Sequence, residues 1–561
     1  MRICAAIHLL LGLVLTTGLS SCFSFDQDKG SLDSASGEQG DSSTTPAGAG
    51  ADADKAGASI PARLDASETF TFRLPGEPET LDWNLAHTMI ETYILMNLME
   101  GLVSVDSNLG IQPALAEKWE VSDDRKVWTF HLRDDVYWSD GVALQARDFV
   151  FSWKRLLAPA TAASYAYFLF DIVGAQEYNA GKLKDFTEVG ITAKGTHTLE
   201  IRLKKPVDYF LYIPGFWVTF PLREDIVRKY GSSWAKPGRM VTLGPYSLAQ
   251  YVLNSRIVLK ANPKYYRFKG NIEWVVAQIV NDNSTALKLY ETGKLDFLTD
   301  ISTLDLERMA GRSDLKTYPY LKTGYLGFSV QKHPANLAGF RRAVAMAIDK
   351  SKMGLVLQGG QTAASTFVPP QLPGYSANAG LAFNPEKARQ ELKRSGVLSG
   401  GKVVVDLLTP NWDKNITLAE YLESELKKNL GIQVNIQPLD HKSFRVQVDL
   451  HTNPLFFGSW GADFPHPDNF LSVFTADSGN NRTQWKNSRY DQLVLRAREG
   501  GRTANESQKL YLSAQKILLE EEAVIVPLYY EPNKALVRAR IKGLTLNPLN
   551  YLLLREVQLE Y

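Results

Sequence analysis

The chain has 561 residues, of which 62 are Lys or Arg and 61 are Asp or Glu, so its net charge is close to zero. A neutral chain without basic clusters is a poor ligand for nucleic acid, and we expect no nucleic-acid partner. Hydrophobic residues make up 44% of the chain and aromatic residues 11%, which predicts large globular cores in several domains.

The first 21 residues have the anatomy of an export signal. A charged start at Arg2 precedes an apolar run over residues 7–15, and small residues follow before Cys22. The run is too short for a bilayer span, which needs about 20 apolar residues. Leu-Ser-Ser-Cys at 19–22 resembles a lipobox, in which the cysteine is lipidated and becomes the first residue of the mature chain. An ordinary signal peptide followed by an incidental cysteine is the alternative.

Cys22 would be the single cysteine left after removal of residues 1–21, because the only other one is Cys4. Such a cysteine forms no disulfide within the chain and fits a lipid anchor better than a redox or metal role. Residues 22–66 would then be the lipidated cysteine and a flexible tether, because Gly, Ser, Ala, Asp and Thr dominate and offer little to bury. A coil of about 44 residues spans roughly 35–40 Å, enough to reach a partner from the membrane.

Residues 127–153 combine a strand, a turn and a helix. Apolar and polar residues alternate over 128–133, the period-two pattern of a half-buried strand. Ser-Asp-Gly at 139–141 predicts a turn, because Asp caps turns and Gly tolerates positive φ. From Phe149 onward, apolar residues recur at i, i+4 and i+7, on one face of a helix.

The rest of the chain mixes strand-like and helix-like stretches without a short-period repeat. Strands are expected at 69–74, 198–203, 257–259, 402–408 and 434–438, and helices at 286–292, 341–349, 385–395 and 417–429. Pro385 suits the first turn of its helix, and Asn429-Leu430-Gly431 is a stop signal. Two strand–helix–strand units result, which favours mainly α/β lobes.

Short motifs follow one another along the chain. They are EGL at 100–102, PALAEKW at 113–119, WTFHLR at 128–133, WSDG at 138–141, DFVFSW at 148–153, FRRA at 340–343, AIDK at 347–350, GSWGAD at 458–463, PDNF at 467–470 and VPLYY at 526–530. Their wording and order resemble the family 5 solute-binding proteins, the peptide-binding components of ABC importers. The resemblance runs from about residue 70 to the C-terminus.

The resemblance implies an α/β fold with two lobes, the periplasmic-binding-protein fold of type II, with an extra inserted domain and a ligand cleft between the lobes. By the matching motifs, lobe I comprises residues 67–89, 213–318 and 531–561. The inserted domain comprises 90–212 and lobe II 319–530. Composition alone does not locate these limits.

A receptor for many peptides must recognise the ammonium, the carboxylate and the backbone that all peptides share. Main-chain hydrogen bonds can hold an extended peptide as an added strand, and a buried carboxylate must pair with the ammonium because an unpaired buried charge is costly. The resemblance assigns that carboxylate to Asp463, and backbone contact with the peptide to Ser459, Trp460 and Gly461. From the residues alone, Asp463 would be a turn cap and Trp460 a core residue.

Other cleft residues follow from the resemblance less directly. Lys332 matches a lysine that can reach the ligand carboxylate, and a solvated surface lysine is the alternative. Tyr165 and Glu77 match positions that line the cleft. Asn415 and His441 fall near pocket positions by spacing.

The chain departs from the family pattern at Phe457, where well-known oligopeptide binders carry an arginine. The resemblance then implies that a fixed clamp for the ligand carboxylate is missing, which leaves the preferred peptide length open. Gly461, where some relatives have cysteine, and Trp83, where many have proline, are milder departures.

Enzyme motifs are absent. The sequence contains no H-E-x-x-H, no G-x-S-x-G and no P-loop, and its eight His residues lack metal-site spacing. We expect no enzyme activity, no cofactor and no metal.

The sequence as a whole predicts an extracytoplasmic substrate-binding lipoprotein, held at the cell membrane or outer membrane by its lipid alone. We expect a monomer that captures oligopeptides and delivers them to the permease subunits of an ABC importer. One alternative is the same fold with another ligand, such as a nickel chelate, haem, or a cell-wall or signalling peptide. Another is a surface adhesin or host-factor-binding lipoprotein, and a hydrolase is a remote third.

Overall fold

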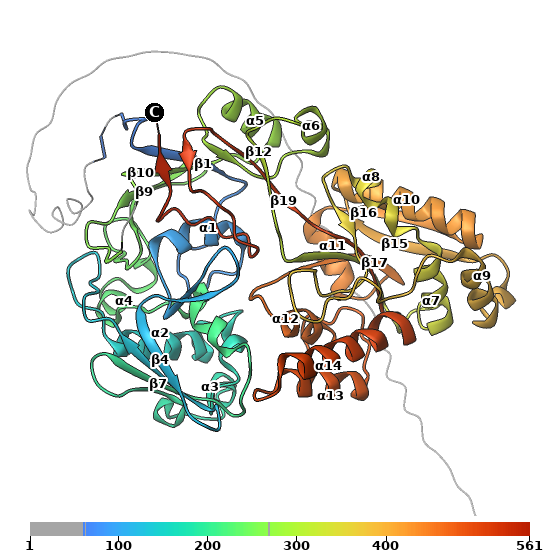
Figure 1. Cartoon of the computed structure of the whole chain (residues 1–561), viewed down its shortest axis with the longest axis horizontal. Coiled ribbons are helices and arrows are strands. Elements are labelled where there is room, and N and C mark those ends of the chain that lie inside the picture. Colours follow the sequence, from blue (N-terminus) through green and yellow to red (C-terminus); the bar gives the residue numbers. More distant parts are fainter. Residues whose placement is uncertain (1–59, 62, 268–269, 561) are drawn as a thin grey trace, which may run out of the picture. The chain divides into compact units, whose positions relative to one another are not determined.

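A computed structural model describes residues 60–61, 63–267 and 270–560 (Figure 1). The expected signal segment, Cys22 and most of the expected tether lie outside the described residues. Among the helices that are described, none has both the length and the apolar character that crossing a bilayer requires.

Lobe I is built on a seven-stranded mixed sheet. In sheet order its strands are β12 (Leu315–Tyr318), β19 (Asn533–Val537), β11 (Phe297–Leu298), β1 (Thr69–Leu74), β10 (Trp274–Ile279), β9 (Arg256–Ala261) and β8 (Tyr246–Val252). Helix α1 (Met89–Leu98) follows β1 in the chain and contacts β8, and helices α5 (Asn283–Glu291) and α6 (Thr303–Arg308) lie between β10 and β12 in the chain. The central strand β1 runs parallel to both β10 and β11. The strands expected at 69–74 and 257–259 are confirmed.

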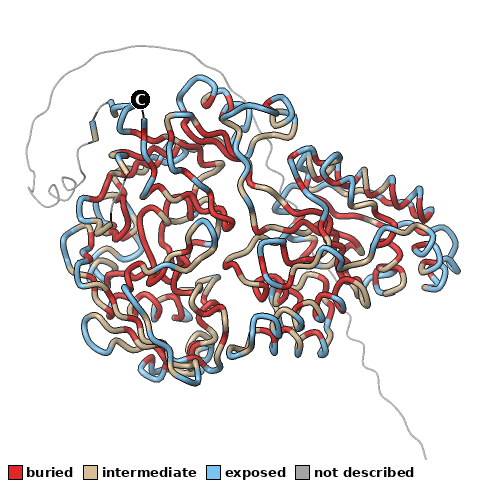
Figure 2. Tube along the Cα trace, in the orientation of Figure 1, coloured by how far each residue is buried: buried red, intermediate tan, exposed pale blue. Residues whose placement is uncertain are grey.

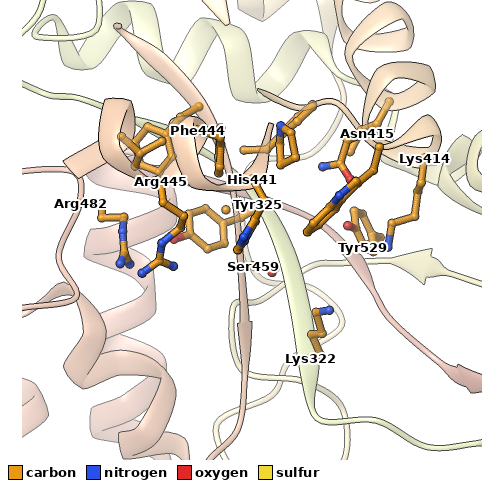
Figure 3. Close-up of a pocket in the computed structure, with 17 residues that line it drawn as sticks. Lys322, Tyr325, Lys414, Asn415, His441, Phe444, Arg445, Ser459, Arg482 and Tyr529 are labelled. Carbon is orange, nitrogen blue, oxygen red and sulfur yellow. The ribbon is translucent and has the colours of Figure 1, made fainter. Parts of the chain in front are cut away.

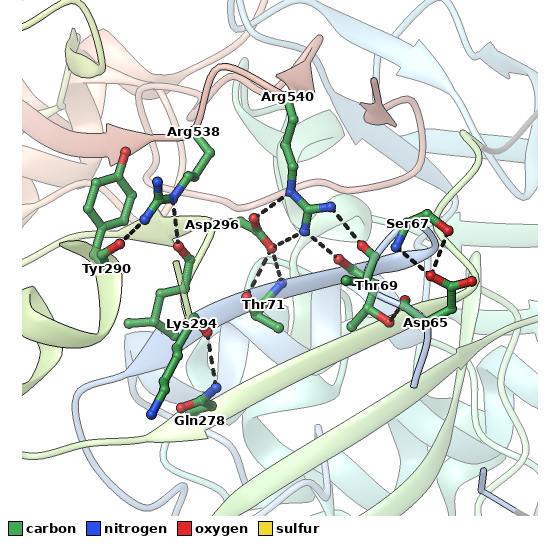
Figure 4. A network of polar contacts seen from close by, with 12 residues as sticks. Asp65, Ser67, Thr69, Thr71, Gln278, Tyr290, Lys294, Asp296, Arg538 and Arg540 are labelled. Atoms are coloured by element: carbon green, nitrogen blue, oxygen red, sulfur yellow. Dashed lines mark hydrogen bonds and ion pairs between the residues drawn. The ribbon is translucent and has the colours of Figure 1, made fainter. Parts of the chain in front are cut away.

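A buried ion pair joins the chain after β19 to the centre of this sheet. Arg540 donates to both oxygens of Asp296, over 2.8 and 2.9 Å, and to the carbonyl oxygen of Thr69 over 2.9 Å (Figure 4). Asp296 also accepts bonds from the backbone and hydroxyl of Thr71 on β1. Since Asp296 is only 3% exposed, its charge needs these partners. The C-terminal segment is therefore an integral part of lobe I, and it ends with the short pair β20 (Ile541–Lys542) and β21 (Gln558–Leu559).

A third region, inserted between α1 and β8, folds around a four-stranded antiparallel sheet. Its strands in order are β4 (Ala116–Val121), β5 (Val127–Leu132), β7 (Thr198–Arg202) and β6 (Ile191–Ala193), accompanied by β2 (Val103–Val105), β3 (Ile111–Pro113), α2 (Ala146–Leu157) and α3 (Ala175–Asn179). Helix α4 (Glu224–Tyr230) follows later in the chain and contacts α2. The alternation in β5 and the apolar face of α2 are confirmed, because their apolar residues are buried. The expected turn is present, with Gly141 at φ +89°.

Lobe II is built on a six-stranded sheet. In sheet order its strands are β14 (Thr362–Ala363), β18 (Ile525–Tyr530), β13 (Lys322–Phe328), β17 (Leu455–Gly461), β15 (Val404–Pro410) and β16 (Gln433–Leu439). Strands β13 and β18 are buried along almost their whole length. Figure 2 shows the buried residues of both lobes in red. The unit expected over 402–438 is confirmed, because α10 (Asp413–Leu430) connects the parallel strands β15 and β16.

Two helices of lobe II have the predicted signals, one at its start and one at its end. Asn384 caps α9 (Pro385–Arg394), with Pro385 in its first turn, and Gly431 at φ +69° ends α10. Helix α7 (Ala338–Ala347) packs against α9 and α10 (Figure 1). The remaining helices are α8 (Met353–Leu357), α11 (His441–Asp449), α12 (Pro467–Leu471), α13 (Ser488–Arg498) and α14 (Ala504–Lys516).

The chain passes from the sheet of lobe I to that of lobe II between β12 and β13, and it returns between β18 and β19. The two connections touch, because the backbone N–H of Glu531 donates to the carbonyl of Lys322 over 3.0 Å. The two sheets are thus joined by two short neighbouring segments. The domain limits expected from the sequence stay a prediction.

Candidate functional site

The C-terminal part of strand β17 has one unpaired edge, which we call the open edge. It pairs with β13 over all seven of its residues, whereas β15 pairs with it only at Leu455 and Phe456. Beyond that point β15 reaches Pro410, which has no N–H to donate, and the chain turns into α10. From Phe457 to Gly461, no described strand covers this edge of β17. An unpaired edge of this kind can accept an extended peptide as a further strand.

Aromatic rings lie directly over glycines of the two central strands. The ring of Tyr529 covers Gly324 and the ring of Tyr325 covers Gly458, so closely that a Cβ at either glycine would overlap the ring. Glycine is therefore required at both positions by the close approach of the rings. The rings form an aromatic surface beside the open edge.

Asp463 follows β17 and is held in place by Asn469 of α12. The side-chain oxygen of Asn469 accepts bonds of 3.0 Å from the backbone N–H of Asp463 and from Nε1 of Trp460, and its amide nitrogen donates to Asp463 Oδ2 over 3.4 Å. Asn469 itself is only 6% exposed. This buried amide thereby fixes both the loop and the direction of the Asp463 carboxylate.

The half-buried carboxylate of Asp463 has neutral partners only. Tyr165, from the inserted region, donates a hydrogen bond of 3.3 Å to Oδ1, and among the described residues Asp463 forms no ion pair. Burial raises the pKa of Asp463 to about 6, although the hydrogen bonds from Asn469 and Tyr165 lower it. The group is therefore a carboxylate without a cation, in surroundings where a cation would stabilise it.

Tyr165 stands in an aromatic cluster that faces Asp463. Its ring centroid lies 5.2 to 5.8 Å from those of Phe168, Phe216, Tyr167 and Trp217. Phe464, the residue after Asp463, packs edge-on against Phe168 at 5.9 Å. The apolar surroundings explain why burial dominates the pKa of Asp463.

A small pocket opens where β15 and β17 separate (Figure 3). It has a volume of about 140 Å³ and is lined by residues of lobe II alone. Phe457, Ser459, Asn415 and His441 all border it, so the structure brings these four sequence-predicted residues together. His441 stacks on Trp412 with ring centroids 5.2 Å apart.

A much larger groove of about 1150 Å³ lies between the two lobes. It is lined by residues of α1 and of the 299–306 segment and, from lobe II, by the start of β13 and the 411–414 segment. Lys322, Trp412 and Lys414 line both the groove and the small pocket, so the two spaces adjoin.

Two sequence-predicted residues lie elsewhere. Lys332 is exposed on the turn after the far end of β13, roughly 20 Å or more from Lys322 at the 3.3 Å rise of a strand. Glu77 accepts bonds from the hydroxyl of Tyr251 over 2.6 Å and the backbone N–H of Asn254 over 2.8 Å, so both of its oxygens hold the β8–β9 turn. Neither residue borders the small pocket or the groove.

Sequence reasoning missed the basic residues of the small pocket. Lys322, Lys414, Arg445 and Arg482 all line it. One signal was available, because Arg445 follows His441 at the i, i+4 spacing that places two side chains on one face of a helix. Arg482 comes from a loop, and only the tertiary fold brings it here. This pocket is therefore positively charged even though position 457 is Phe and not arginine.

Comparison with known proteins decides the family. A family model described as bacterial extracellular solute-binding proteins, family 5 middle, matches residues 110–482. The chain belongs to this family of solute-binding proteins. It is 32% identical to the periplasmic oligopeptide-binding protein OppA of Salmonella typhimurium, over 87% of this chain and 92% of the relative. It is 31% identical to the probable deoxycholate-binding periplasmic protein YgiS of Escherichia coli, over 90% and 96%.

Solved structures of the solute-binding family agree with the fold. The structure of the Escherichia coli murein tripeptide binding protein MppA matches with a TM-score of 0.77 and 29% identity, over 88% of this chain and 99% of that one. Haemophilus influenzae OppA in complex with RPPGFSPFR matches with a TM-score of 0.75 and 27% identity, over 89% and 100%. The expected type II periplasmic-binding-protein fold is confirmed. Members of this family are substrate-binding components of transporters and not enzymes.

Proposed function

We propose that this solute-binding protein captures oligopeptides outside the cytoplasm and delivers them to the permease subunits of an ABC importer. The observation that carries the proposal is Asp463, a half-buried carboxylate with neutral partners beside the open edge of β17. A peptide offers both complements at once, an ammonium for the carboxylate and a backbone for the strand edge. Relatives described as oligopeptide-binding and murein peptide-binding support the same ligand class.

The proposal extends to the organisation of the chain. Residues 67–89, 213–318 and 531–561 would form lobe I, 90–212 the inserted domain and 319–530 the second lobe. Ligand binding would draw the lobes together, and the permease would recognise the closed form. Cys22 would carry the lipid that keeps the monomer at a membrane, with residues 23–66 as its tether.

Mass spectrometry of the purified and denatured protein tests the ligand class. We expect short peptides of mixed sequence to be released, and calorimetry with synthetic peptides to give saturable binding. Release of a bile acid instead, and binding of deoxycholate but of no peptide, would move the protein to the ligand class named for its YgiS relative. No group of His, Cys, Asp or Glu that could hold a metal ion occurs in the described residues.

A further inference from the structure

The small pocket has more basic side chains than nearby carboxylates neutralise. Its titratable lining residues are all basic or His: Lys322, Lys414, His441, Arg445 and Arg482, apart from the two tyrosines 325 and 529. Lys414 is paired with Glu531 over 2.7 Å, and Arg482 with the largely exposed Asp449 over 2.9 Å. Arg445 makes no hydrogen bond and no ion pair with any residue that the structure describes. Arg445 is exposed, so its guanidinium is solvated in the free protein and can pair with a ligand.

Arg445 and Arg482 direct their guanidinium groups toward the same part of the pocket (Figure 3). Burial lowers the pKa of Arg445, and the charge of Arg482 lowers it further, while Asp449 opposes them. Burial raises the pKa of the Tyr325 hydroxyl, and the charges of both arginines lower it. An anion placed between two guanidinium groups relieves their repulsion and gains charge-assisted hydrogen bonds.

The N-terminus of α10 adds to this field. The helix has 18 residues, and the side chain of its N-cap residue, Trp412, makes no capping hydrogen bond to the first turn. The second and third residues of the helix, Lys414 and Asn415, line the pocket. The positive end of a helix stabilises a nearby anion, and Asp413 in the same turn offsets only part of the effect.

We propose that this pocket binds the carboxylate of an acidic side chain, Glu or Asp, of the peptide ligand, with Arg445 and Arg482 as its clamp. The inference rests on the proposed function and adds a ligand preference to it. A side chain is favoured over the peptide C-terminus by shape. The pocket of about 140 Å³ branches from the open edge of β17, whereas the adjoining groove of about 1150 Å³ leaves room for the ligand chain to continue.

The geometry also gives the position of the acidic residue. Ser459, which lines the pocket, lies four residues before Asp463, and this spacing corresponds to roughly 13 Å along an extended chain. A ligand whose ammonium meets Asp463 would therefore bring about its fourth or fifth residue to the pocket. The neighbouring residues of the ligand would face away, since side chains alternate along a strand.

Calorimetry on a peptide scan tests the inference. Alanine-based heptapeptides carry a single Glu at each of positions 2 to 6, each matched by a Gln peptide, and every peptide is made with a free and with an amidated C-terminus. We expect Glu at one position, about the fourth or fifth, to bind roughly tenfold to a hundredfold more tightly than Gln, the range for hydrogen bonds to charged groups. Amidation should leave this preference intact.

Protein variants locate the effect. Arg445→Gln should abolish the preference for Glu over Gln at that position. Arg496→Gln, an exposed arginine on α13 of the same lobe that does not line the pocket, should preserve the preference. If neutral peptides bind and need Asp463, but Glu gives no gain at any position, the inference fails and the proposed function stands. The inference is also wrong if the gain in affinity depends on a free peptide C-terminus and not on the Glu side chain. If no peptide of the scan binds, both fail.

Discussion

The hydroxyl of Tyr165 donates a 3.3 Å hydrogen bond to the carboxylate of Asp463, which joins the inserted region to lobe II at one charged group. The bond orients the carboxylate but leaves its charge uncompensated, since a phenol is neutral. A peptide ammonium would supply the missing charge at this point. The carboxylate of Asp463 is therefore held in a fixed orientation while its negative charge has no counter-ion. Such a group favours the binding of a cation.

The first prediction concerns the charge of Asp463. Asp463→Asn retains the shape but leaves a bound ammonium without its counter-ion, and breaking such a buried pair costs roughly 3–5 kcal/mol. Peptide affinity should fall by about two to three orders of magnitude or more. N-acetylation of the peptide removes the other partner and should weaken binding to the wild type by a similar factor.

A double cycle of Asp463→Asn against N-acetylation, measured by calorimetry, separates the pair from its parts. We expect acetylation to matter little in the variant, because the pair is already lost. Independent, additive penalties would show that Asp463 is a loop residue and that the ammonium binds elsewhere.

The second prediction concerns the glycine beneath Tyr325. Gly458→Ala places a methyl group where the Tyr325 ring lies, so the ring or the strand must shift, which typically costs 1–3 kcal/mol of unfolding free energy. Gly479→Ala is the matched control, because a Cβ there would meet nothing within 4 Å. Denaturant unfolding of both variants measures the difference. Equal stability of the two would show that the ring has room to move.

Most of the fold could be predicted from the sequence where local signals are strong. The alternation in β5, the Asn384-Pro385 start of α9 and the Gly431 stop of α10 are all local patterns, and the structure has them. The family resemblance supplied the two lobes, which no local pattern contains. The open edge of β17 was not predictable, because it depends on where β15 leaves the sheet.

The site was predicted only in part. Phe457, Ser459, Asn415 and His441 meet at one pocket, and Tyr165 reaches Asp463. Lys332 and Glu77 do not meet them, because one lies past the far end of β13 and the other is engaged by the β8–β9 turn. Arg445 and Arg482 were missed since long-range folding, and not sequence spacing, brings a helix and a distant loop together.

The third prediction concerns the anchor at Cys22. Cys22→Ser removes the thiol that would carry the lipid, so the chain should lose its label in cells grown with a fatty-acid analogue. We expect the folding of residues 67–561 to be unaffected. Cys4→Ser is the control and should keep the label, since Cys4 would be removed with the signal. Equal labelling of both variants would exclude lipidation at Cys22.

The last prediction concerns pH. Because the pKa of Asp463 is raised to about 6 in the free protein, the carboxyl takes up a proton as the pH falls below about 6. Only the ionised form pairs with an ammonium, and a peptide N-terminus remains charged below its pKa of about 7.7–8.0. Peptide affinity should therefore fall between pH 7 and pH 5, approaching tenfold per pH unit below the pKa.

The raised pKa of Asp463 affects the stability of the free protein in the opposite direction, because it favours folding at low pH. The folded state binds the proton more tightly than the unfolded state, so this group's contribution is fully present at low pH and is lost as the pH rises through about 6. Ligand binding should reverse that loss, because the ammonium restores the charge balance. Peptides should accordingly raise the melting temperature more at pH 7 than at pH 5.

Variants assign the pH effect to this carboxylate. Tyr165→Phe removes a hydrogen bond that lowers the pKa of Asp463, so the midpoint of the affinity profile should move to higher pH. Tyr167→Phe is the control, because Tyr167 makes no hydrogen bond to Asp463, both described residues, although the charge of Asp463 raises the pKa of Tyr167. Calorimetry from pH 5 to 7 should give a flat profile for Asp463→Asn. A flat profile in the wild type would mean that the ammonium is held by a group other than Asp463.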